Sequence, residues 1–382
     1  MDVNQQFYML LRFGLGLTQD FSFKPTPNEW AKLYQIAQKQ SLLGITYNAV
    51  NKLGPERRPP LEIALQWATL AESIRDYNKL MNAESARLTS FFETQGHSTA
   101  ILKGQANARL YPDVLSRQPG DIDIYVDGGQ NKVTQMLLRT GLMTSNPRFA
   151  NEGKHDKPTK RYHHVHLPPN ENGIDVEVHF RPSSGNAYPL TNRRIQKFLL
   201  DEIKHTELVP EGFHVPSMKF ALIMQLSHIQ RHFLNTGIGL RQICDYLILL
   251  KETTTQERAQ VAVLLNRFGL KKMAGALMWL LVQVFHMDEA LMLCEPDSYR
   301  GEWFLHEIME RGNFGRFSSN RHNKLWKRIM ISRLRHLRLL RFNFKEELWI
   351  ELNYWKFIIV TIPERIRRKT FSFAQHNKSL NH

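Results

Sequence analysis

Apolar residues recur at helical spacing in the first quarter of the chain. Trp30, Leu33 and Ala37 fall on one helical face, and a similar series follows near residues 80–92. Glycine–proline and proline–proline pairs interrupt the pattern between residues 54 and 60. We therefore expect an N-terminal helical region over residues 1–95.

The spacing changes to an alternation of apolar and polar residues after residue 97. Four short segments have the pattern of strands: 98–102, 121–126, 161–167 and 174–180. The turn-forming residues 168–173 predict a hairpin between the last two, and the polar residues 145–160 predict a loop. These segments predict an α/β core over residues 96–212.

Helical spacing returns from about residue 216. Phe220, Ile223 and Met224 begin it, and residues 243–250 and 257–285 continue it. This pattern predicts a helical domain over 213–312, followed by a tail over 313–382. The expected fold class is α+β, with a small mixed β-sheet embedded between helical N- and C-terminal regions.

The net charge of +15 is concentrated in the tail. Residues 311–382 hold 17 Lys and Arg against 4 Asp and Glu, a net of +13, and the other 310 residues carry only +2. A uniformly basic nucleic-acid-binding fold is therefore excluded.

Cysteine content and hydropathy indicate the compartment. Cys244 and Cys294 are too few for a disulfide framework or a four-thiolate zinc site. The start of the chain lacks the basic region of a secretory signal. The most apolar stretch, 273–285, is too short to span a bilayer of about 30 Å. We expect a cytoplasmic protein without a transmembrane segment, with peripheral membrane contact as an additional option.

Acidic residues alternate with apolar ones in two of the expected strands. In 121–126, Asp121 and Asp123 share one face, and in 174–180, Asp175, Glu177 and His179 do so. A divalent cation would remove the repulsion between such carboxylates, and oxygen ligands suit Mg²⁺ or Mn²⁺ better than zinc. A solvated polar sheet face is the alternative.

A glycine turn follows the first expected strand. Lys103-Gly104 stands before the helix-like residues 105–110, where backbone N–H groups at a helix start can approach phosphate oxygens. Neither a Walker sequence nor a Gly-x-Gly-x-x-Gly motif occurs, which excludes P-loop and Rossmann folds.

These motifs together resemble a known family. Leu-Lys-Gly at 102–104, Arg-x-x-Gly-Asp-Ile-Asp at 117–123 and Val-Glu-Val-His-Phe at 176–180 are similar to the uncharacterised nucleotidyltransferase family of the DNA polymerase beta superfamily. The resemblance covers roughly residues 5–290. It implies metal-dependent transfer of a nucleoside monophosphate from an NTP, with ATP as the first choice, to an unknown hydroxyl acceptor.

The resemblance also implies roles for individual residues. Asp121, Asp123 and Glu177 would be the catalytic and metal-binding carboxylates, and the nucleotide would be held by Lys103, Gly104, Gln105 and Arg117. Two features depart from the superfamily pattern: Gln105 stands where Ser or Gly usually follows the glycine, and Glu177 replaces the commoner Asp. Asp175 competes with Glu177 for the third position.

Histidines cluster near the second acidic strand. His164 and His179 are accessory candidates for substrate or phosphate contact, and a zinc site or a polar sheet surface are the alternatives for the whole group: His155, His163, His164, His166 and His179. His228 and His232 share a helix face, where helix packing or a polar contact with Asp245 is expected.

The tail predicts a basic amphipathic helix, because residues 324–345 contain no acidic side chain. Its apolar stripe is Trp326, Met330, Leu334, Leu337, Leu340 and Phe344. Such a helix can dock on the body, lie on an anionic membrane surface, or contact RNA. Two alternatives to the enzyme follow: a catalytically inactive nucleotide-binding member of the same fold, and an adaptor acting through the tail.

Overall fold

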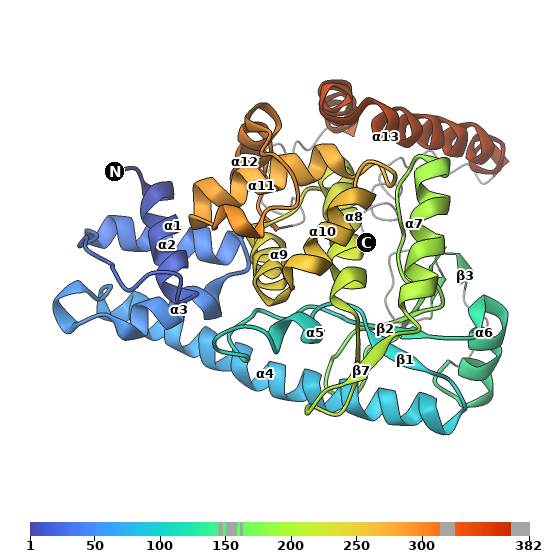
Figure 1. Ribbon diagram of the computed structural model, residues 1–382, viewed down its shortest axis with the longest axis horizontal. Coiled ribbons are helices and arrows are strands. Elements are labelled where there is room, and N and C mark those ends of the chain that lie inside the picture. Colours follow the sequence, from blue (N-terminus) through green and yellow to red (C-terminus); the bar gives the residue numbers. More distant parts are fainter. Residues whose placement is uncertain (144–147, 150–158, 161–162, 314–324, 368–382) are drawn as a thin grey trace.

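A computed structural model describes residues 1–143, 148–149, 159–160, 163–313 and 325–367 (Figure 1). The first region is helical, as expected: α1 (Val3–Gly14), α2 (Pro27–Lys39), α3 (Leu43–Lys52) and α4 (Leu61–Thr94). A capping box between Thr26 and Glu29 starts α2 directly after the proline-containing segment. The long α4 runs beneath the sheet and connects the N-terminal helices to the α/β core (Figure 1).

The central sheet is mixed, with strand order β1-β2-β6-β5-β4-β3. Its strands are β1 (Thr99–Ile101), β2 (Ile122–Val126), β3 (Arg148–Phe149), β4 (Thr159–Lys160), β5 (His164–Leu167) and β6 (Val176–His179). β2 and β6 are parallel, whereas β1 and β5 lie antiparallel to their neighbours β2 and β6. Most of the expected loop 145–160 lies outside the described residues.

The sheet is covered on both faces. Its apolar face, with Ile122 and Val176, packs with side chains of α4 and of α6 (Gly129–Arg139). On the opposite face, Asp123 is only 2% exposed and Tyr125 only 8%. A solvated polar face is therefore the wrong interpretation for Asp123, because the C-terminal helices cover it.

The C-terminal helices form one core with the N-terminal ones. They are α7 (Pro189–Glu202), α8 (Met218–Asn235), α9 (Leu240–Glu252), α10 (Thr255–Leu264), α11 (Lys271–Phe285) and α12 (Ser298–Arg311), with a small hairpin of β7 (Thr206–Leu208) and β8 (His214–Pro216) after α7. The stretch 257–285 is interrupted between α10 and α11, where Gly269 adopts a φ of +69°. The α+β class is confirmed.

The last element is α13 (Leu325–Arg367), which bends at the non-helical Asn343. Leu339 and Phe342 are fully buried, whereas Trp326, Leu337 and Phe344 of the expected stripe are exposed. Docking through that stripe is therefore wrong: the helix meets the body through other residues. Within the described residues, every helix is too short or too polar to cross a bilayer.

Candidate active site

Two parallel strands bring the acidic motifs together. β2 and β6 pair in a register that places Asp123 beside Glu177, and the N–H of Ile122 bonds to the carbonyl of Asp175. Asp121 precedes β2 and has the same alternation as Asp123. The two motifs, more than 50 residues apart in sequence, thus meet on one sheet face.

Lys103 supplies positive charge to the carboxylates of β2. Its Nζ lies 2.8 Å from Asp123 Oδ2 and 3.9 Å from Asp121 Oδ1. Burial alone would lower the pKa of Lys103, but Asp121, Asp123 and Glu177 outweigh it and raise the pKa. Burial also raises the pKa of Asp121 to about 6, although Lys103 opposes the shift. The neighbouring negative charges of Asp121 and Asp123 therefore favour a cation between them.

Histidines surround Glu177. His164 Nδ1 lies 3.1 Å from one carboxylate oxygen and His179 Nε2 lies 3.4 Å from the same oxygen, while His166 Nδ1 lies 3.6 Å from the other. His179 Nε2 is also 3.0 Å from Asp123 Oδ1. Burial opposes protonation of His179, but these two carboxylates raise its pKa to about 9. His179 therefore bridges the two acidic strands.

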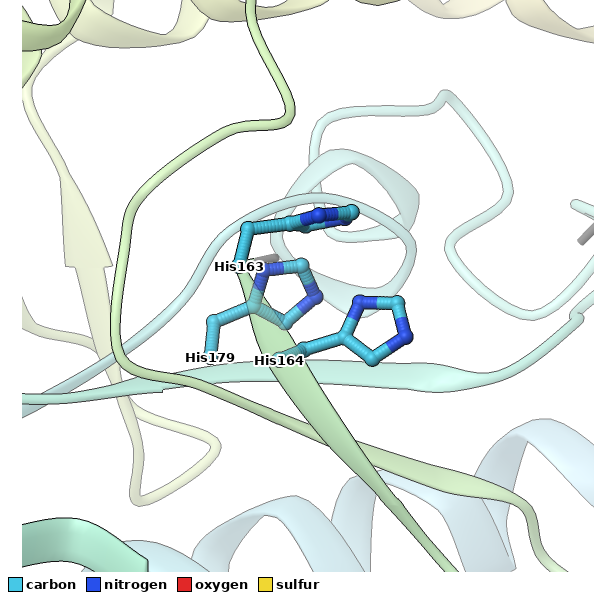
Figure 2. Close-up of side chains that lie close together, drawn as sticks. All are labelled: His163, His164 and His179. Carbon is cyan, nitrogen blue, oxygen red and sulfur yellow. The ribbon is translucent and has the colours of Figure 1, made fainter. Parts of the chain in front are cut away.

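Two overlapping side-chain groups have the spacing of metal ligands. One ligand atom from each of Asp123, Glu177 and His179 lies within 4.8 Å of the others, and the same holds for His163, His164 and His179. Figure 2 shows the three imidazoles of the second group side by side, with His163 against His179. Burial lowers the pKa of His163 well below its usual value, so its ring stays neutral.

The first group fits a catalytic cation better, because its two carboxylates supply the oxygen ligands that Mg²⁺ and Mn²⁺ prefer. The three-histidine group offers the nitrogen ligands that suit zinc, which stays the alternative. His155 lies outside the described residues. Asp175 is half-exposed and contacts His166 at 3.6 Å, and it joins neither group.

The glycine turn lies directly after β1. Gly104 has a φ of +63°, which a residue with a side chain adopts only under strain, and it caps the short helix α5 (Gln105–Ala108). The Gln105 side chain is buried, and its Nε2 donates to Asn82 Oδ1 at 2.6 Å on α4. The residue that departs from the superfamily pattern thus anchors the turn to α4.

Arg117 forms a buried bidentate ion pair with Asp245 of α9. Its Nε and Nη2 lie 2.7 Å from Oδ1 and Oδ2, and the Tyr111 hydroxyl donates to Oδ1 at 2.8 Å. Arg241, also on α9, donates to the carbonyl of Gln118 at 2.9 Å. These contacts tie the segment leading into Asp121 to the helical domain.

A pocket opens between the sheet and helices α8 and α9. Its lining residues are Lys103, Gly104, Arg117, Gly120, Asp121, Asp123, Gln225, His228, Ile229, Arg241, Gln242 and Asp245. Lys103, Gly104, Arg117, Asp121 and Asp123 were expected in the site from the sequence, whereas Gln105, Glu177, His164 and His179 do not line this pocket. His228 packs against His232 at 4.2 Å between ring centroids, in line with the helix packing that was one of the two expectations, and the Asp245 carboxylate pairs with Arg117.

Sequence reasoning missed the contribution of the helices to the pocket. Gln225 and His228 come from α8, and Arg241 and Gln242 come from α9. From the sequence, His228 was expected only to share a helix face with His232, and Gln225, Arg241 and Gln242 were given no role. Apolar periodicity locates such helices but does not show which polar side chains they bring to a distant strand.

The chain has counterparts among protein families and solved structures. No curated protein matches the chain. The crystal structure of an antigenic nucleotidyltransferase-like protein from Paracoccidioides brasiliensis is similar over 58% of this chain and 96% of that one, with 14% identity and a TM-score of 0.35, which indicates a partial likeness only. The family model described as uncharacterised nucleotidyltransferase matches residues 26–286, and the chain therefore belongs to that family.

Proposed function

We propose that this protein is a metal-dependent nucleotidyltransferase that moves a nucleoside monophosphate from an NTP to a hydroxyl acceptor. The observation that carries the proposal is the meeting of Asp121, Asp123, Lys103 and Gly104 at one pocket, with Glu177 beside Asp123 on the neighbouring strand. Family membership supports a nucleotide substrate. ATP is the NTP to test first.

The carboxylates of Asp121, Asp123 and Glu177 would hold Mg²⁺ or Mn²⁺. The bound ions would activate the acceptor hydroxyl and neutralise charge on the leaving pyrophosphate. Lys103, which pairs with Asp123 at 2.8 Å, would contact a triphosphate oxygen when a metal ion takes its place. The turn at Gly104 would let the backbone approach that triphosphate without a side chain in the way.

The remaining proposed residues divide into two groups. Arg117 and Gln105 would act as positioning residues, because the guanidinium is paired with Asp245 and the amide with α4. His179 and His164 would orient Glu177, and His179 would release its bond to Asp123 as metal binds. Asp175 lies at the edge of this arrangement and is retained as an accessory candidate.

One observation favours a second candidate, a nucleotide-binding member without turnover. Three histidines lie against Glu177, and Lys103 and His179 both contact Asp123. If these contacts persist when nucleotide is bound, Glu177 does not coordinate the metal. The same pocket would then bind an NTP without transferring it.

Transfer of label separates the two candidates. The protein is incubated with Mg²⁺ or Mn²⁺, α-phosphate-labelled ATP and a cell lysate that supplies acceptors. We expect a labelled product with the parent chain and with Asp201→Asn, a control on the exposed surface of α7, but none with Asp121→Asn. Calorimetric ATP binding without label transfer to any acceptor would instead establish the second candidate.

A further inference from the structure

Helix α13 carries an unusual share of the exposed apolar surface. Ten of the 21 exposed large apolar side chains in the described chain lie on it. Nine of the ten form an outer stripe along both halves of the helix: Trp326, Met330, Leu334 and Leu337 before the bend, then Phe344, Leu348, Leu352, Trp355 and Ile359 after it. Steps of three and four residues place each series on one helical face.

The opposite side of α13 fixes it to the body. Leu339 and Phe342 are fully buried, and Arg300 of α12 donates to the carbonyl of Phe342 at 2.9 Å. Arg335 Nη1 donates to the carbonyl of Leu234 at the end of α8 at 3.0 Å. Because these anchors occupy the inner face, the outer stripe points away from the core, and packing within the described chain does not explain it.

Charge is also sorted between the two faces. Glu346 accepts bonds from the backbone N–H groups of Ala187 and Tyr188, Glu347 pairs with His336, and Glu351 pairs with Arg333. Glu346 therefore faces the body, and Glu347 and Glu351 face the other half of α13 across the bend. The exposed charged side chains described on α13 are all basic: Arg338, Arg341, Lys345 and Lys356.

We propose that the outer face of α13 binds the surface of an anionic lipid bilayer. Apolar side chains enter the boundary between headgroups and acyl chains, and neighbouring Lys and Arg contact lipid phosphates. Trp326 and Trp355 suit that boundary, because tryptophan concentrates at membrane interfaces. This inference concerns a surface separate from the pocket and does not depend on the proposed reaction.

Two other occupants fit the surface less well. Single-stranded RNA gains affinity by stacking bases on aromatic rings, and the outer stripe consists mainly of Met, Leu and Ile, which offer no such platform. A second copy of the chain would bring two basic faces together, and the like charges would repel. An anionic bilayer satisfies both the apolar and the basic components.

Vesicle flotation tests the proposal with the full chain. Vesicles contain phosphatidylcholine alone or with one third phosphatidylserine, at low and at physiological salt. We expect binding to the anionic vesicles only. Replacing Arg338, Arg341, Lys345 and Lys356 by Gln should weaken that binding by about 100-fold or more, and Leu337→Ser with Leu352→Ser should also abolish flotation.

Matched controls separate this surface from general stickiness and from misfolding. Leu61→Ser and Val263→Ser remove apolar side chains that are equally exposed on the body, and they should leave flotation unchanged. All variants should keep the parent circular dichroism spectrum and ATP binding. Equal binding to neutral vesicles, absence of binding, dimerisation through this face, or retention of an RNA oligonucleotide in preference to anionic vesicles would each overturn the proposal.

Discussion

The sheet core and α13 both contain carboxylates that are largely shielded from solvent, but the surroundings of these carboxylates differ. In the core, Asp121 and Asp123 border a pocket and share one lysine, so a metal ion could replace Lys103 there. In α13, Glu346 accepts hydrogen bonds from the backbone before α7 and Glu351 pairs with Arg333, so each carboxylate has a partner within the protein. Buried acidity alone therefore does not indicate chemistry; the access of a ligand to it does.

The largest difference in transfer activity is expected between a carboxylate-to-amide exchange in the pocket and the same exchange in α13. Asp123→Asn removes charge from the pocket and should lower nucleotide transfer by about 10³-fold or more. Glu347→Gln, in the buried contact with His336, should change transfer less than about twofold. Initial rates with labelled ATP measure both, and comparable losses would mean that the two regions act as one site.

The next contrast concerns two arginine ion pairs. Arg117 and Asp245 have side chains about 5% exposed, so Arg117→Met leaves a buried carboxylate unpaired and should cost about 3–5 kcal/mol in unfolding free energy. Arg333 and Glu351 are more than four times as exposed, and Arg333→Met should cost about 1 kcal/mol or less. Urea denaturation measures both costs. Equal values would contradict the expectation that burial sets the energetic cost of breaking each ion pair.

Acid should destabilise the body through His232. Burial, together with Lys103 and Arg231, lowers the pKa of His232 to about 3 in the folded state. The unfolded chain binds this proton near pH 6.5 and the folded chain does not, so stability is present above pH 6.5 and declines as the pH falls. The loss between pH 7 and pH 5 is about 2 kcal/mol.

Two histidine variants check this dependence. His232→Gln should flatten the pH profile of the unfolding free energy by that amount, and His205→Gln, at an exposed position, is the matched control. An unchanged slope in His232→Gln would show that other groups govern acid sensitivity.

The smallest effect is expected at the outer stripe. Leu337 is 61% exposed, so Leu337→Ser should change the free energy of unfolding by less than about 0.5 kcal/mol. Leu339, on the inner face of the same helix, is fully buried, so Leu339→Ala should cost about 2–5 kcal/mol in unfolding free energy. A large loss in Leu337→Ser would mean that the stripe stabilises the fold and is not a free surface.

Local patterns predicted much of the scaffold. The helices of residues 1–95, the strands around 122–126 and 176–179 and their apolar faces follow from periodicity, which depends only on which residues neighbour one another along an element. The roles assigned to Asp121, Asp123 and Glu177 remain predictions. Periodicity does not show where distant elements meet. It placed Asp123 on the polar face of its strand, but it did not show that α8 and α9 cover that face.

The tail shows the same limit in another form. The 3.6-residue spacing correctly indicated a helix. Docking on the body through the stripe from Trp326 to Phe344 was one of the alternatives, but α13 docks through Leu339 and Phe342. A helical wheel ranks faces by hydrophobicity, whereas docking depends on shape and on partners such as Arg300 that lie elsewhere in the chain.

The sequence by itself determined the family, the α+β class, and the order of acidic and glycine motifs, because these reside in local composition and spacing. Only the tertiary structure decided that Asp123 pairs with Glu177 across parallel strands, that histidines surround Glu177, and that Arg117 is held by Asp245. It also decided which face of α13 remains free. Such facts depend on contacts between residues far apart in the chain, which packing of the whole core selects.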